Sequence, residues 1–209
     1  MSDVIVYGSP ASTYVRTVRM ALEEKGVGYT LEQVNIREPA YRERHPFGKM
    51  PAFRHGELEL WESNAIAHYV DEKFDGPALQ PAEAVDRARM HQWVSAVNDY
   101  IYPTAIRQYA LEYVFPSGPD GKPDREKLEN GLAEARQRLK VFDQALSSQP
   151  YLAGDAVSVA DFFLLPIAFY LGTLPEGRET MGGLPNIKAW HDRMAERPSF
   201  AATLPPRPA

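Results

Sequence analysis

The stretch that decides the fold is His45–Phe74, which reads HPFGKMPAFRHGELELWESNAIAHYVDEKF. A strand is predicted to begin at Pro51, because proline has no N–H to donate and is tolerated at the first residue of a strand. The pair His55-Gly56 predicts a two-residue turn, and the alternation of charged and apolar side chains over residues 57–61 predicts a second strand. A helix with one apolar stripe is then predicted to begin at Glu62-Ser63.

The predicted helix start at Glu62 and Ser63 has the chemistry of a binding site. The N-terminus of a helix carries unpaired N–H groups and the positive end of the helix dipole, so it attracts a carboxylate. Ser63 adds a hydroxyl at the same place, and Glu62 offers a negative charge to a cation. The free end of an amino acid carries both an ammonium and a carboxylate, so this corner is suited to bind such a group.

The residues before this stretch complete a compact α/β unit. An apolar run at residues 4–7 predicts a buried strand, and Ser12 or Thr13 can cap the helix that follows. Residues 29–36 alternate loosely and predict another strand. Strand, helix, strand, hairpin and helix together form a predicted domain over residues 1–75.

The residues after this unit predict an all-helical domain. Residues 76–81 contain glycine and prolines and are predicted to be a linker. The long periodic stretch that follows should be kinked or divided at Pro103. Ser158 and Asp161 predict a capping box at the start of a buried central helix. The predicted fold class is therefore α/β plus all-α, with the helical domain over residues 82–209.

The composition argues against several kinds of function. The 209 residues carry a formal net charge of −5 with scattered lysines and arginines, which argues against a nucleic-acid surface. The chain has no cysteine, which excludes disulfides, thiolate metal sites and a cysteine nucleophile, and its histidines show no metal-ligand spacing. The lack of cysteine fits a cytoplasmic protein, and the start of the chain predicts neither a signal peptide nor a membrane span.

The decisive stretch resembles the glutathione-binding half of glutathione transferases, closest to the phi-like and related bacterial classes. Their pattern N-P-F-G-x-V-P-A-F stands here as residues 45–53, with His45 in place of Asn and Met50 in place of Val. Their E-S-x-A-I stands as residues 62–66, and their S-x-A-D as residues 158–161. The resemblance spans nearly the whole chain, and it implies a thioredoxin-like N-terminal domain followed by a helical C-terminal domain.

The resemblance implies a role for each residue of the binding segment. In that family the proline that matches Pro51 is cis, and the residue before it, here Met50, pairs with the cysteinyl backbone of glutathione. The pair Glu62-Ser63 is expected to hold the γ-glutamyl end. Lys49 is expected to reach the glycyl carboxylate. Family members often use a His-Lys pair before this loop as well; no such pair stands in residues 37–44, and Arg37 or Arg42 is the candidate to replace it.

The group that activates the thiol is predicted in the loop before the first helix. A thiol is a poor nucleophile until it ionises, and a hydrogen-bond donor beside a helix N-terminus stabilises the thiolate. The phi-like motif P-A-S-x-x-x-R matches residues 10–16, and its catalytic serine falls on Ser12. Three alternatives stay open: Tyr7, near the tyrosine of the tyrosine-type classes, Ser9, where omega-like members have cysteine, and Thr13.

The resemblance implies a cytoplasmic detoxification enzyme, expected to be a homodimer, in which the glutathione thiolate attacks a small hydrophobic electrophile. Tyr109 and Tyr113 belong to an apolar stripe that is expected to line the second-substrate pocket, and Phe47 is a candidate for insertion into a partner subunit. Two other functions stay open: glutathione-dependent reduction of peroxides or disulfides, and a non-catalytic glutathione-binding or scaffold protein. Neither a metal nor a nucleic-acid or membrane partner is expected.

Overall fold

The computed structural model of the protein describes residues 3–206, and within them the chain forms two compact units. One unit consists of residues 3–81 together with 195–206, and the other of residues 82–194. The change from the first unit to the second falls at the end of the predicted linker, residues 76–81. Each unit is described below by itself.

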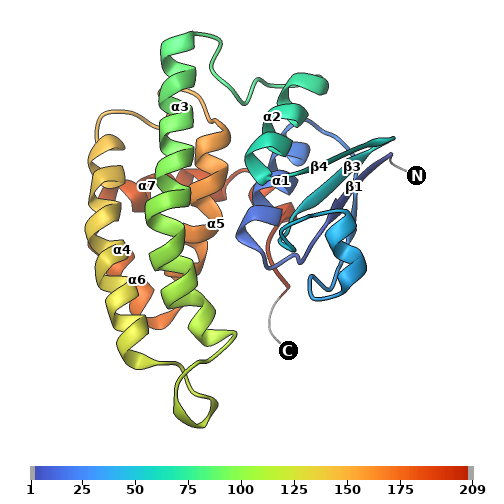
Figure 1. The fold of residues 1–209 in the computed structure, drawn as a ribbon. Coiled ribbons are helices and arrows are strands. Elements are labelled where there is room, and N and C mark those ends of the chain that lie inside the picture. The colour runs from blue at the N-terminus through green and yellow to red at the C-terminus, as the bar shows by residue number, and fades with distance from the viewer. Residues whose placement is uncertain (1–2, 207–209) are drawn as a thin grey trace. The chain divides into compact units, whose positions relative to one another are not determined.

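The first unit is built on a four-stranded mixed sheet (Figure 1). Across the sheet its strands are β2 (Thr30–Glu32), β1 (Val4–Tyr7), β3 (Ala52–His55) and β4 (Leu58–Trp61). β1 pairs in parallel with β2, while the β1–β3 and β3–β4 pairs are antiparallel, so the predicted hairpin is confirmed. The strand predicted over residues 29–36 has only three residues, because its partner β1 ends at Tyr7, opposite Glu32.

Helices α1 (Thr13–Glu24) and α2 (Ser63–Lys73) pack against each other on one side of the sheet, as Figure 1 shows. Successive side chains of a strand alternate between its two faces. Val6 and Phe53 are paired in the sheet and share the face toward these helices, where the Phe53 ring lies 6.0 Å from the ring of Tyr69 in α2. This face therefore holds the apolar core between sheet and helices.

The opposite face of the sheet carries Tyr7, which packs with Tyr41 of the short helix η1 (Pro39–Glu43). The guanidinium carbon of Arg44 lies 4.3 Å from the centre of the Tyr7 ring. Tyr7 is almost completely buried in this cluster. Its ring is thus held on the side of the sheet away from α1.

The C-terminal segment departs from the predicted helical domain over 82–209. Helix α8 (Pro198–Ala202) packs against α1 of the first unit. Just before it, the guanidinium of Arg197 donates two hydrogen bonds, of 2.8 and 2.6 Å, to the carboxylate of Glu24 in α1. Residues 195–206 therefore belong to the first unit, because long-range contacts that no local pattern encodes hold them there. The first two and last three residues of the predicted domains lie outside the described residues.

The second unit is helical. Its segments are α3 (Ala84–Ala96), η2 (Val97–Tyr109), η3 (Ala110–Tyr113), η4 (Pro119–Gly121), α4 (Arg125–Ala145), α5 (Val159–Thr173), α6 (Pro175–Gly182) and α7 (Pro185–Ala195). Segment η2 is a π-helix with Pro103 inside it, so the helical segment continues through the proline. Proline lacks an N–H and its ring clashes with the carbonyl four residues earlier, and the wider π-helical winding relieves this conflict.

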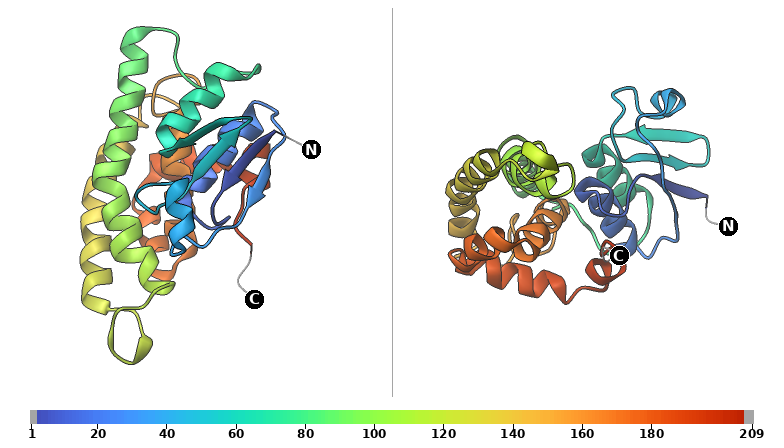
Figure 2. Two further views of the ribbon diagram at one scale, coloured as in Figure 1. Left: turned by 45° about the vertical axis from the view of Figure 1, so that its right-hand side comes forward. Right: turned by 90° about the horizontal axis from the view of Figure 1, so that it is seen from below.

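The core of the second unit forms around α5. Figures 1 and 2 both show α4, in yellow, running beside the green α3–η2 segment, and α5 packs against α3 and η2. The predicted capping box at the start of α5 is confirmed, with Ser158 and Asp161 completing both of its hydrogen bonds. Nearly all residues of α5 are buried, as its continuous apolar sequence predicted.

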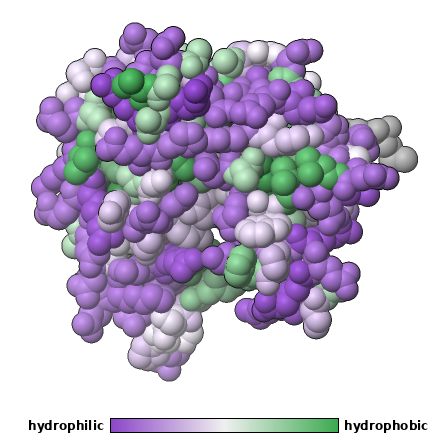
Figure 3. Space-filling view, turned by 45° about the horizontal axis from the view of Figure 1, so that its top comes forward, coloured by the Kyte–Doolittle hydropathy of each residue, from purple (hydrophilic) through white to green (hydrophobic). Residues whose placement is uncertain are grey.

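The face drawn in Figure 3 is mostly hydrophilic, with apolar side chains in small separate groups. Within residues 3–206, no single helix has the length and apolar character needed to cross a membrane; α5 and α6 meet those criteria only as a pair bent by 114°.

Candidate active site

The register of the sheet brings three predicted site segments to the same end of the first unit. Tyr7 of β1 pairs with Ala52 of β3, and Ala52 in turn pairs with Trp61 of β4. The loop after Tyr7, the turn before Ala52 and the helix start after Trp61 must therefore lie together at that end. These three segments carry Ser12, the residues Lys49 to Pro51, and the pair Glu62-Ser63.

The first segment places Ser12 at the N-cap of α1. Its backbone is extended, with φ of −69° and ψ of 130°, and its Oγ accepts a hydrogen bond of 3.4 Å from the N–H of Val15. Ser12 is only partly buried. A serine in this position leaves its own hydroxyl proton available to donate to an anion at the N-terminus of the helix.

The alternatives to Ser12 have different surroundings. Ser9 Oγ accepts a 3.3 Å hydrogen bond from the N–H of Ala11, and Thr13 is buried. Tyr7 lies in the cluster on the opposite face of the sheet, packed with Tyr41. Thr13 and Tyr7 are both buried, which limits their access to a ligand at the start of α1.

The second segment is held against the first by direct contacts. The Ser9 N–H donates to the sulfur of Met50 at 3.2 Å. A Cβ at Gly8 would lie only 2.4 Å from Val15 Cγ2 and 3.4 Å from Met50 Cβ, so only glycine allows this close packing. The Met50–Pro51 peptide bond is cis. Lys49, the residue before Met50, is exposed.

The third segment is the start of α2, where Glu62 has an unusual backbone conformation. Its φ of 70° and ψ of 112° lie in the region that favours glycine, and its side chain makes no capping hydrogen bond. Glu62 is exposed, whereas Ser63 is buried at the first position of the helix. A strained residue whose carboxylate does not cap its own helix is typical of a functional site.

Tyr109 and Tyr113 lie in the second unit, where both hydroxyls face α6. The Tyr109 hydroxyl accepts a 2.8 Å hydrogen bond from the Gly177 N–H and lies 3.4 Å from Glu176 Oε2, while the Tyr113 hydroxyl donates to the same oxygen. Burial and the nearby Glu176 raise the pKa of Tyr113 to about 12, and burial also raises that of Tyr109. Their predicted contact with a second substrate stays a prediction.

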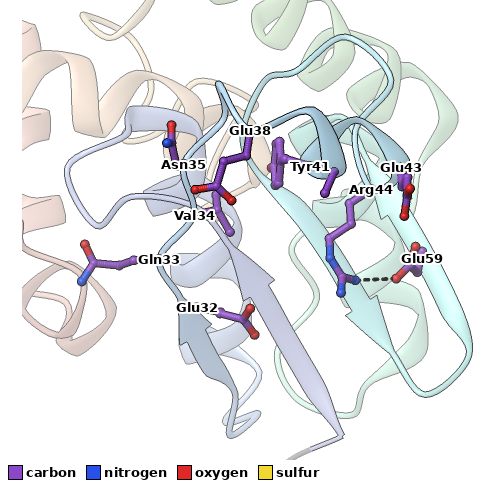
Figure 4. A pocket seen from close by; sticks show the side chains of 10 residues that line it. Glu32, Gln33, Val34, Asn35, Glu38, Tyr41, Glu43, Arg44 and Glu59 are labelled. Atoms are coloured by element: carbon purple, nitrogen blue, oxygen red, sulfur yellow. Dashed lines mark hydrogen bonds and ion pairs between the residues drawn. The ribbon is translucent and has the colours of Figure 1, made fainter.

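A separate hollow of about 490 Å³ lies beside β2, η1 and β4 (Figure 4). Its lining includes Glu32, Glu38, Glu43 and Glu59, and the last of these pairs with Arg44 at 2.7 Å. Glutathione carries a net negative charge at neutral pH, so this acidic lining disfavours it. Across residues 3–206, no group of three or more His, Asp or Glu is arranged to hold a metal ion.

Sequence reasoning did not find the contacts that connect the predicted residues. No local signal points to the hydrogen bond between Ser9 and Met50, because the two residues are 41 positions apart. The positive φ of Glu62 was equally hidden, since glycine and not glutamate is the residue that signals this conformation.

Comparison with known proteins agrees with this fold over almost the whole chain. Residues 6–78 match the family described as glutathione S-transferase, N-terminal domain, and residues 101–198 match glutathione S-transferase, C-terminal domain. The chain is 33% identical to a probable glutathione S-transferase, GSTF1, of Oryza sativa subsp. japonica, with 100% of both chains covered.

Solved structures give the same result. The apo form of glutathione S-transferase III superposes with a TM-score of 0.87 at 30% identity, covering 98% of this chain and 99% of that one. Glutathione S-transferase I from maize, in complex with an atrazine glutathione conjugate, gives 0.84 at 27% identity, covering 96% and 95%. The thioredoxin-like unit followed by a helical unit defines a transferase fold, and the chain belongs to the glutathione S-transferase family.

Proposed function

We propose that this protein conjugates the thiolate of glutathione to small hydrophobic electrophiles. The observation that carries the proposal is the convergence of three segments at one end of the sheet: the capped start of α1, the turn with Lys49 and Met50, and the uncapped start of α2. Together they offer a hydroxyl, a cation, backbone groups and a carboxylate to one small zwitterionic ligand. Membership of the glutathione S-transferase family supports this assignment.

In this proposal each segment binds one part of the tripeptide. The Glu62 carboxylate accepts hydrogen bonds from the γ-glutamyl ammonium. Ser63 and the N–H groups at the start of α2 bind the carboxylate of the same γ-glutamyl residue. The backbone of Met50, next to Pro51, pairs with the cysteinyl residue. Lys49 attracts the glycyl carboxylate.

Ser12 is proposed as the catalytic residue. Its hydroxyl donates to the glutathione sulfur, and the positive end of the α1 dipole favours the same charge, so both lower the pKa of the bound thiol. The glutathione thiolate then attacks the electrophile. A bond forms between the glutathione sulfur and the electrophilic carbon, and the leaving group departs with the electrons of the bond that breaks. Holding the two reactants together supplies further acceleration.

Substitution of Ser12 by alanine tests this role, with Ser9→Ala as the matched control in the same loop. In Ser12→Ala the bound thiol should ionise at higher pH and the kcat for an aryl halide should fall about 100-fold. The Kd for glutathione should stay within about threefold, because the thiol contributes little to binding. Full activity of Ser12→Ala, with a loss in Ser9→Ala or Tyr7→Phe, would move the role to that residue.

The wild-type protein decides between conjugation and the alternatives. Glutathione binding without turnover of any aryl halide, peroxide or disulfide would favour a scaffold protein. Turnover of peroxides or disulfides alone would favour direct reduction by the bound thiolate. A protein that neither binds glutathione nor turns over substrate would overturn the whole assignment.

We also propose a homodimer that works in cytoplasmic detoxification. Phe47 is 62% exposed at the turn beside the site, so its ring is accessible for insertion into a partner subunit. Light scattering of wild type and Phe47→Ser tests this: wild type should have the mass of a dimer, and the variant should dissociate at low concentration. A monomeric wild type would contradict it.

A further inference from the structure

His45 stands at the position where the glutathione transferase pattern has asparagine, and its ring is enclosed. The residue is only 2% exposed, and its Nδ1 is buried without a hydrogen-bond partner among residues 3–206. A buried polar atom without a partner is unfavourable. The unpaired Nδ1 therefore does not stabilise the free protein. The contacts of the His45 ring instead indicate a role in the candidate site.

The backbone of His45 opens the turn that carries two site residues. Its carbonyl accepts a 2.8 Å hydrogen bond from the N–H of Gly48, and its own N–H donates to the Tyr41 carbonyl at 3.0 Å. Lys49 and Met50 follow immediately. A shift of His45 must therefore move both of these residues.

The side chain of His45 faces the other half of the site. Its ring centre lies 5.7 Å from that of Trp61 and 6.4 Å from that of Phe47. Trp61 is the last residue of β4 and directly precedes Glu62. One aromatic contact thus connects the turn with Lys49 to the strand end that leads into Glu62.

The charge of the ring is controlled by its surroundings. Burial lowers the pKa of His45, Glu62 raises it and Lys49 lowers it, with a net decrease. The ring is therefore neutral at pH 7 and packs as an aromatic group. Protonation below the usual histidine range would place a second positive charge beside Lys49 in an enclosed position.

We propose that His45 is a positioning residue for glutathione: its neutral ring, packed against Trp61 and Phe47, keeps Lys49 and Met50 at a fixed separation from Glu62. This inference rests on the proposed function, since it assumes that these residues bind one tripeptide. His45 itself touches no ligand and acts through its neighbours. The tripeptide is bound at both ends, so a change in this separation weakens binding without altering the bound thiolate.

The test compares His45→Ala, which removes the ring, with His45→Phe, which keeps a ring but cannot be protonated. In His45→Ala the Kd and KM for glutathione should rise about tenfold while kcat stays within about twofold, and His45→Phe should recover most of the affinity. A matched control is His191→Ala in the helical unit, which should leave Kd unchanged. If the role of His45 were purely structural, His45→Ala would contain less folded protein and its total activity would fall in the same proportion, with no change in KM.

The pH profile provides an independent readout. In the wild type the Kd for glutathione should increase as the pH falls below the ordinary titration range of histidine, because burial lowers the pKa of the ring and so places its protonation there. His45→Phe should bind equally well across that range. The proposal would be overturned by equal Kd values for wild type and His45→Ala, or by an equal loss of glutathione affinity in His45→Phe and His45→Ala. If the wild type still conjugated glutathione, the proposed function would be unaffected by that result. Lack of glutathione binding by the wild type would instead remove the proposed function itself.

Discussion

The starts of helices α2 and α5 show how one structural feature serves two purposes. At α5 the carboxylate of Asp161 is completely buried and accepts hydrogen bonds from the N–H groups of Leu152 (3.0 Å) and Ser158 (2.9 Å) and from Trp190 Nε1 (2.9 Å). At α2 the carboxylate of Glu62 is exposed and caps nothing. Every helix start has N–H groups to satisfy, and at α5 the chain satisfies them itself.

The difference teaches where to look for binding. The polar groups at the start of α5 make their hydrogen bonds within the protein, so they contribute to stability and are not available to a ligand. At α2 the carboxylate of Glu62, the residue just before the helix, makes no capping hydrogen bond, and its backbone is held in a strained conformation with positive φ. An acidic residue and a serine stand at both helix starts. At α5 they are hydrogen-bonded within the protein, whereas at α2 the Glu62 carboxylate caps no N–H group, which is why we propose α2 as the ligand-binding start.

The largest expected effect is that of Asp161→Ala. The substitution leaves these three N–H donors and the buried Ser158 hydroxyl without their acceptor, so the free energy of unfolding should fall by about 4 kcal/mol. Urea denaturation followed by circular dichroism measures this. Asp155→Ala, which removes an exposed carboxylate from the same loop, should cost less than about 0.5 kcal/mol. A loss below about 1 kcal/mol in Asp161→Ala would break the comparison.

Glu112 extends the comparison to a second carboxylate that the chain satisfies itself. It is buried and accepts hydrogen bonds from the Lys127 ammonium and from the N–H groups of Ser117 and Asp124, both at 3.0 Å. These bonds, with Lys127 foremost, lower its pKa from 4.5 to about 2 despite the burial. We expect Glu112→Gln to reduce the free energy of unfolding by about 3 kcal/mol at pH 7.

The pH dependence of this effect has a definite sign. A carboxylate with a lowered pKa in the folded state stabilises the protein fully above its unfolded value, and the contribution is lost as the pH falls from 4.5 toward 2. The stability difference between wild type and Glu112→Gln should therefore shrink over that range in urea titrations. The exposed Glu126→Gln serves as the control. A difference that stays constant down to the lowest accessible pH would argue against this account.

For the open helix start we expect an effect on binding and not on folding. Glu62→Ala should raise the Kd for glutathione about 30-fold, equivalent to about 2 kcal/mol, because the ligand ammonium loses its counter-charge. The free energy of unfolding should not decrease. Calorimetric titration with glutathione measures the first quantity, and Glu57→Ala in the hairpin is the matched exposed control. If Glu62→Ala bound normally but unfolded more easily, the roles assigned to the two helix starts would be reversed.

The smallest effect concerns backbone strain. Glycine tolerates the φ of 70° at Glu62, so Glu62→Gly should increase the free energy of unfolding by about 1 kcal/mol while it weakens glutathione binding. Asp120→Gly is the natural control, since Asp120 is the other non-glycine residue with positive φ (57°) among the described residues. It should stabilise to a similar degree without changing glutathione binding. A destabilised Glu62→Gly would show that this conformation carries no strain.

Local pattern was sufficient for most of the architecture. The hairpin, the start of α2 at Ser63 and the capping box at Ser158 depend on residues within a few positions of one another, and all three are present. Features that depend on distant contacts were not predicted. Examples are the attachment of residues 195–206 to α1 through Arg197 and the π-helical winding around Pro103.

By itself, the sequence determined which residue types this protein offers to a ligand: a hydroxyl in Ser12, a cation in Lys49, and a carboxylate and hydroxyl in Glu62 and Ser63. Only the tertiary structure decided which polar groups of these segments are accessible: it buries Tyr7 and Thr13 and leaves Glu62 exposed and uncapped. The physical reason is that residue type and spacing set local conformation and charge. Access and hydrogen-bond partners instead depend on packing between segments far apart in the chain.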